Sequence, residues 1–295
     1  MYSKDQNHKR RLSYDRYVKY LFIASACLMA LIIFSIIFFV GKQGLMTFSQ
    51  VSPFEFFFTS KWNPMGHQFG ALSFIVGSLL VTILAVLIGA PLGLLGALFM
   101  AKIAPNWLRE IMRPATELYV AIPSIVYGYI GLTLLVPFLR EVFHVKSGFG
   151  VLAAAVVLAV MILPTIISIS EDAICSVPSM MEEASLALGA TRWQTIFHVL
   201  VPAALPGILT AIILAMARAI GETMAVQMLI GNTPMVATTL FSSTSTLTSN
   251  IVVEMGNTPF GSVWGNSLFL MALVLLVISL GMILLIRRLG SRRYA

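Results

Sequence analysis

The sequence predicts an all-α integral membrane protein with six transmembrane helices. Two observations concern composition: 58% of the residues are hydrophobic, and only 11% are charged, against about 25% in a soluble domain. The third observation is that apolar segments of about 20 or more residues recur, each long enough to cross a hydrocarbon core of about 30 Å. In chain order these segments are 20–40, 73–101, 114–139, 149–169, 201–230 and 263–286.

The first apolar segment, 20–40, follows a basic tail and contains "ASAC" at Ala24 to Cys27, which loosely resembles a lipoprotein cleavage site. The apolar run continues past Cys27 to Val40, whereas the apolar core of a removed signal peptide is normally about 7 to 15 residues long. We therefore expect a retained helix.

The second and third segments contain residues that shape membrane helices. The glycines of the second are expected to be close-packing positions, because small residues let helices approach; they are Gly77, Gly89, Gly93 and Gly96. In the third, "AIPSIVYG" places Pro123 and Gly128 in an apolar run. This pattern indicates either a kink that neighbouring helices tolerate or a lining role for Ser124 or Tyr127. Glu117, Glu171 and Asp172 are expected to be solvated near helix ends.

Two ionisable residues lie inside the fifth segment, in "LAMARAIGETMAVQMLIG". A charge there costs about 2.5 to 3.5 kcal/mol on insertion scales, so Arg218 and Glu222 are functional candidates. Their spacing predicts one helix face, within reach of each other. The pair either neutralises itself, or Arg218 attracts an oxyanion through its guanidinium while Glu222 accepts a hydrogen bond from a P–OH group and repels fully deprotonated anions. The second interpretation weakly favours phosphate over sulfate.

The loop between the fourth and fifth segments predicts two short helices. Ser179 followed by Glu182 fits a capping box, Gly189 fits a left-handed helix terminus, and Thr191 followed by Gln194 fits a second capping box. An apolar side at helical spacing is formed by Trp193, Ile196, Phe197 and Leu200. Such a pair of helices lies in the headgroup layer or docks a cytoplasmic partner.

Lys and Arg residues are unevenly distributed between the two sides of the membrane. Most of the 19 lie in the two tails and in the loops 102–113 and 170–200. The opposite loops contain Lys42, Lys61, Arg140 and Lys146. The positive-inside rule therefore predicts that both termini are cytoplasmic. The net charge of +7 reflects this topology, and no nucleic-acid partner is expected.

The stretch "EEASLALGATRWQTIFHVLVPAALPGI" resembles the EAA loop of ABC-importer permeases. It departs from that pattern at Ser185, Val199 and Val201, each a residue of similar character. In that family the loop is a coupling helix that inserts into the ATPase subunit. The resemblance implies a coupling segment at about 179–200, with ATPase-coupling residues Glu182, Glu183, Ala184, Gly189, Ala190 and Trp193.

Further motifs resemble PstC, the permease subunit of the phosphate-specific ABC importer. They are "ARAIGETMAV", "AIPSIVYGYIGL" and "FFFTSKWNP" followed by "FGAL", in a match that runs from about residue 50 onward. The related PstA permease usually reads G-E-T-A-P where this chain has Met224 and Ala225. The resemblance implies a type I ABC importer permease fold and a substrate path at Arg218, Glu222, Thr223 and Ser124.

The domains expected on this basis are an N-terminal region, 1–72, a transmembrane core, 73–286, and a basic cytoplasmic tail, 287–295. The resemblance implies phosphate import across the bacterial cytoplasmic (inner) membrane. Expected partners are a homologous second permease, two ATPase subunits, a periplasmic or extracellular phosphate-binding protein and membrane lipid. The alternatives are a permease for phosphonate, sulfate or molybdate, or the paralogous partner permease of the same importer.

No enzymatic activity or bound cofactor is expected for this chain. It lacks G-x-x-x-x-G-K-[ST], the phosphate-binding loop of ATPases, so ATP and Mg are expected on the separate ATPase subunit. The four histidines lack metal-ligand spacing, and no metal site is expected. An intramembrane serine protease is disfavoured because no histidine lies in a spanning segment. An autonomous channel or secondary transporter would leave the coupling-like loop unexplained.

Overall fold

The computed structural model describes residues 2–291, and the last four residues of the expected basic tail lie outside this range. The chain folds into helices with one two-stranded hairpin. The first half contains α1 (Tyr2–Leu45), η1 (Met46–Ser49), α2 (Pro53–Phe58), β1 (Trp62–Asn63), η2 (Pro64–Gly66), β2 (Gln68–Phe69), α3 (Leu72–Leu98), η3 (Phe99–Ile103), α4 (Asn106–Ala121), α5 (Ser124–Ile130), η4 (Gly131–Leu135) and α6 (Val136–Val142). The second half contains α7 (Val151–Cys175), α8 (Ser179–Ala187), α9 (Arg192–Thr195), η5 (Ile196–Leu200), α10 (Val201–Gly221), α11 (Met224–Leu229), α12 (Leu247–Met255) and α13 (Val263–Ser291).

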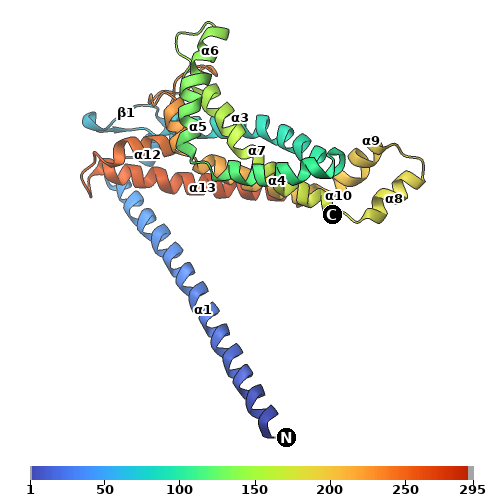
Figure 1. Ribbon diagram of the computed structural model, residues 1–295. Coiled ribbons are helices and arrows are strands. Elements are labelled where there is room, and N and C mark those ends of the chain that lie inside the picture. The colour runs from blue at the N-terminus through green and yellow to red at the C-terminus, as the bar shows by residue number, and fades with distance from the viewer. Residues whose placement is uncertain (1, 292–295) are drawn as a thin grey trace.

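Six helical spans in the described residues are long and apolar enough to cross a membrane. They are Tyr17–Ser49, Leu72–Ile103, Ser124–Val142, Val151–Cys175, Arg192–Gly221 and Val263–Arg288. In Figure 1, α7, α10 and α13 run along one direction, α5 and α6 stand across them, and α1 projects away. The prediction of an all-α protein with six transmembrane helices is therefore confirmed, although two of the six predicted segments are not single helices.

The predicted third segment, 114–139, is broken at its start. Helix α4 ends at Ala121, Ile122 has extended backbone (φ −64°, ψ 129°), and α5 begins after Pro123. Proline disfavours helical backbone in the residue before it and supplies no N–H. The "AIPS" motif therefore ends one helix and begins another, and α4 is amphipathic with no buried residue.

The centre of the bundle is formed by α3, α7 and α10. A Cβ at Gly93 would lie 2.6 Å from Cγ2 of Ile166, and one at Gly89 would lie 3.0 Å from Cδ1 of Ile162. Both neighbours belong to α7, so α3 and α7 approach too closely for larger residues. The predicted close-packing role of these glycines is confirmed.

The end of the bundle opposite α8 and α9 carries the β1–β2 hairpin and α12 (Figure 1). Strands β1 and β2 are antiparallel, with Trp62 opposite Phe69. The carboxylate of Glu254 accepts hydrogen bonds from Nε1 of Trp62 at 2.8 and 3.0 Å and from Nε1 of Trp264 at 2.7 Å. These contacts fasten the hairpin, α12 and α13 together.

The Ser- and Thr-rich loop after α11 folds inward. Every residue from Thr244 to Asn250 is buried. Oγ of Ser78, on α3, accepts a hydrogen bond of 2.9 Å from the Leu247 amide, which lies at the N-terminus of α12. The capping box of Thr246 and Ser249 begins this helix.

Candidate translocation path and coupling segment

The predicted fifth segment, 201–230, is interrupted at Glu222. Helix α10 ends at Gly221, Glu222 is extended (φ −69°, ψ 127°), and α11 starts at Met224. The freed groups find new partners: the Glu222 carboxylate accepts from the Ala225 amide at 3.4 Å, and the Glu222 carbonyl accepts from Oγ1 of Thr248 at 3.3 Å. Irregular backbone at membrane depth is tolerated when protein contacts satisfy it in this way.

The break corrects the expectation that Arg218 and Glu222 share a helix face within reach of each other. Arg218 lies in the last turn of α10, whereas Glu222 lies beyond the helix terminus. The ion pairs of the described residues are Lys102–Glu182, Arg113–Glu171 and Arg113–Asp172. Arg218 thus has no acidic partner there.

The guanidinium of Arg218 lies within electrostatic range of the Tyr127 phenol on α5. Helix α5 packs against α11, where a Cβ at Gly128 would lie 3.0 Å from Cα of Ala225. Two helix interruptions, before Ser124 and at Glu222, therefore belong to elements in contact. Both Ser124 and Arg218 are partly exposed.

The Tyr127 hydroxyl donates to the Tyr119 carbonyl at 2.7 Å, across the interruption between α4 and α5. The structure therefore gives Tyr127 a role in closing the break. Thr223 donates its hydroxyl to the Gly221 carbonyl at 3.2 Å and satisfies the end of α10.

Thr248 was not among the residues predicted from the sequence to line the path. Its side chain joins α12 to the Glu222 carbonyl, although the two residues are far apart in the sequence. The sequence feature that contains Thr248 is the run "STSTLTSN", and a run of Ser and Thr is equally typical of a solvated loop. Only the fold shows that the run is buried beside the break.

The coupling segment, residues 179–200, forms two helices joined at Gly189, which has φ of +87°. The predicted capping box of Thr191 and Gln194 is present. The one predicted at Ser179 is wrong, because Pro178 occupies the N-cap position and Ser179 is already the first helical residue. The Glu182 carboxylate binds Nζ of Lys102 at 2.6 Å instead.

The predicted coupling residues divide by exposure. Glu183, Ala184, Gly189 and Trp193 are exposed, whereas Glu182 and Ala190 are partly buried. Large apolar side chains are also exposed here: Leu188 is 90% exposed, and Trp193 stacks on Phe197 with ring centroids 6.0 Å apart.

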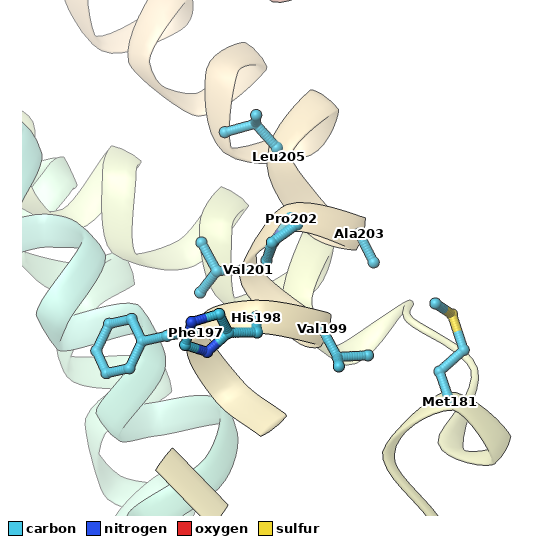
Figure 2. A pocket seen from close by; sticks show the side chains of 8 residues that line it. All are labelled: Met181, Phe197, His198, Val199, Val201, Pro202, Ala203 and Leu205. Carbon is cyan, nitrogen blue, oxygen red and sulfur yellow. The ribbon is translucent and has the colours of Figure 1, made fainter. Parts of the chain in front are cut away.

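An open groove of about 630 Å³ adjoins this apolar surface. Figure 2 shows Met181 of α8 beside the turn that leads from η5 into α10. The groove is lined by Met181, Phe197, His198, Val199, Val201, Pro202, Ala203 and Leu205. The groove extends the apolar face of the coupling segment toward the membrane helices.

Comparison with known proteins establishes the family. Residues 91–293 match the family described as binding-protein-dependent transport system inner membrane component. The chain belongs to this family. As a member, this permease is a multi-pass protein of the inner membrane, and it is a transporter subunit rather than an enzyme.

Individual relatives agree with this assignment. The permease is 53% identical to the probable ABC transporter permease protein YqgH of Bacillus subtilis, over 92% of this chain and 90% of that protein. It is 37% identical to the phosphate transport system permease protein PstC of Mesorhizobium japonicum, over 82% of this chain and 78% of that protein. The resemblance to phosphate permeases stated from the sequence is thereby confirmed.

A solved structure supports the fold. The permease matches a chain of a bacterial ABC transporter involved in the import of the acidic polysaccharide alginate, with a TM-score of 0.62. The two are 18% identical, and the match covers 96% of this chain and 99% of that one. The type I importer permease fold is thus confirmed.

Proposed function

We propose that this permease forms, with partner subunits, the path by which inorganic phosphate enters the cytoplasm. The observation that carries the proposal is Arg218, a partly buried cation in a membrane helix without an acidic partner in the described residues. Ionisable residues in membrane spans are rare and are commonly associated with substrate pathways. A guanidinium also presents donors that match oxyanion geometry.

Phosphate is favoured over sulfate by Glu222. Its carboxylate repels a fully deprotonated anion but accepts a hydrogen bond from a P–OH group, which phosphate retains near neutral pH. The PstC relatives, 31 to 37% identical, support this substrate. Beside the two helix interruptions, Ser124 is proposed as a hydroxyl donor and Thr223 as a residue that lines the path, because the Thr223 hydroxyl already donates to the Gly221 carbonyl.

The complete transporter is proposed to contain a homologous second permease, two ATPase subunits and an external phosphate-binding protein. The exposed apolar face of the coupling segment, with Leu188 and Trp193, supports docking on an ATPase because such a patch is unfavourable in water. ATP and Mg would be bound by that subunit. ATP binding would close the ATPase dimer, move the coupling segment and open the path outward, and hydrolysis would reset it.

Uptake of radiolabelled phosphate by phosphate-starved cells that lack the native permease tests the proposal. Wild type should restore uptake that excess sulfate does not inhibit, and Arg218→Gln should lower it about a hundredfold at equal membrane abundance. Normal uptake by Arg218→Gln would make Arg218 a structural residue. If wild type restores no phosphate uptake with all partners present, another oxyanion, namely phosphonate, sulfate or molybdate, becomes the leading substrate.

A further inference from the structure

The coupling segment is joined covalently to two membrane helices. Helix α7 leads into α8 through residues 176–178, and α9 continues through η5 into α10 as one span. Neither route reaches α3, although α3 packs along both α7 and α10 at the centre of the bundle. Packing therefore links α3 to the coupling segment indirectly, through α7 and α10, and a direct link from α8 to α3 would be a further connection.

An ion pair supplies this connection. Nζ of Lys102 lies 2.6 Å from Oε2 of Glu182, and the two side chains are 21% and 34% exposed. Lys102 belongs to η3, the π-helical turn that continues α3, and Glu182 belongs to α8. A partly desolvated pair is screened less than one at the surface.

The two ends of this ion pair are held very differently. Around Lys102, Leu98 and Ala101 are buried in a cluster with Ile174 and Leu200, and Arg109 Nη2 donates to the Ala101 carbonyl at 3.1 Å. Helix α8, in contrast, has no buried residue.

The side chains of α8 make two hydrogen-bonded contacts within the described part of the chain. One is the Lys102–Glu182 pair, and the other joins Ser185 to Thr195 of α9, inside the coupling segment itself. The pair is therefore the side-chain hydrogen bond by which α8 reaches the membrane core.

We propose that the Lys102–Glu182 pair is a strut that makes α3 follow the movement of the coupling segment. This inference rests on the proposed function, and it changes the role expected for Glu182. Glu182 acts through Lys102 as a positioning residue, whereas the exposed residues of the segment are left to contact the ATPase.

The experiment compares variants in proteoliposomes that contain the complete transporter, with external binding protein. Lys102→Met and Glu182→Gln are the test variants, and Lys102→Met should keep the ATPase bound and its basal hydrolysis unchanged. Phosphate transported per ATP should fall about five- to tenfold, at the lower end of typical coupling effects. The charge swap K102E/E182K should restore it. Glu110→Gln is the matched control, since Glu110 is exposed on α4 and should transport as wild type does.

Two outcomes would overturn the strut. One is normal transport by both single variants. The other is normal transport by Lys102→Met with loss in both Glu182→Gln and the swap, because that pattern means that Glu182 contacts the ATPase directly.

A readout without substrate separates this inference from the proposed function. The Leu95 side chain of α3 is 58% exposed. A cysteine placed there by Leu95→Cys can be labelled with a maleimide once the free Cys27 and Cys175 are replaced by serine. Trapping with ATP and vanadate should change its labelling rate in the wild-type background. Glu182→Gln should abolish that change, and the charge swap should restore it. An unaltered change in Glu182→Gln contradicts the strut, whichever anion is transported.

Discussion

Arg218 and Glu222 are four residues apart in the sequence, yet the end of α10 separates them and they form no ion pair. Glu222 turns its carboxylate to the Ala225 amide, while Arg218 lies in the last turn of α10. An acid four residues beyond an arginine in a continuous helix would neutralise it. The break keeps the two charges available for separate roles.

Arg218→Lys should transport phosphate less well than wild type but better than Arg218→Gln. Lysine keeps the positive charge and loses the planar fork of donors, so a bidentate oxyanion contact is weakened. We expect loss of about tenfold for Lys and about a hundredfold for Gln, as one or two charge-assisted hydrogen bonds would give. Initial uptake rates at equal membrane abundance measure both. Equal rates for Arg218→Lys and wild type would show that guanidinium geometry does not matter.

Glu222→Gln should relax anion selectivity without disturbing the break. The amide oxygen of glutamine can still accept from the Ala225 amide, but the negative charge is removed. Sulfate should then compete with phosphate about tenfold better. The free energy that corresponds to this factor is smaller than the Coulomb energy of two nearby charges. Inhibition of phosphate uptake by graded sulfate measures this effect. Unchanged sulfate inhibition would remove Glu222 from the selectivity argument.

The sequence was sufficient for the membrane spans because their signal is local. A span needs only a long apolar run, and all six runs correspond to spans in the structure. At the interruption, in contrast, the Glu222 carbonyl accepts a hydrogen bond from Thr248, which is distant in the sequence. No local sequence pattern predicts that contact, so the fifth segment is predicted from the sequence as one helix.

Partners of charged residues show the same limit. Glu171 was expected to be solvated near a helix end, but it is buried and accepts two hydrogen bonds from Arg113 of α4, at 3.1 and 2.9 Å. Glu182 was expected to cap its own helix and instead binds Lys102. A charge at the end of a helix can be satisfied locally or by a distant element, and only the packing decides between them.

Gly128→Ala should destabilise the contact between α5 and α11. The new Cβ would lie 2.9 Å from Sδ of Met228 and 3.0 Å from Cα of Ala225, so the helices must separate. Overpacking of this kind costs about 1–3 kcal/mol. Thermal unfolding in detergent should show a lower midpoint, and phosphate uptake should fall with it.

The matched control is Gly281→Ala in α13, where a Cβ meets nothing within 4 Å. It makes the same chemical change in a membrane helix and should leave the unfolding midpoint unchanged or slightly raised. Similar midpoints for the two variants would contradict the tight approach of α5 to α11.

Arg113→Gln should destabilise the attachment of α4 to α7. The hydrogen bonds and charge of Glu171 raise the pKa of the Arg113 guanidinium, and removal of the cation leaves a buried carboxylate poorly paired. Arg113 is itself 51% exposed, so solvent moderates the effect to about 1–2 kcal/mol. Asp172→Asn is the control, because Asp172 lies 3.8 Å from Arg113 and is 72% exposed. Proteolysis of α4 in membranes should accelerate in Arg113→Gln alone, and equal acceleration in both variants would refute the distinction.

Glu254→Gln should weaken the end of the bundle that carries the β1–β2 hairpin. The carboxylate accepts from the indole N–H groups of Trp62 and Trp264, and in glutamine one oxygen becomes an NH₂ donor that cannot accept. Loss of a charge-assisted hydrogen bond at this partly buried site should cost about 1–2 kcal/mol. The unfolding midpoint should therefore fall, with a red shift in tryptophan fluorescence as the hairpin loosens. Glu141→Gln, an exposed residue of α6, should change neither quantity. If Glu254→Gln matches that control, Trp62 is held by apolar packing against Phe69 and Phe74 rather than by the carboxylate.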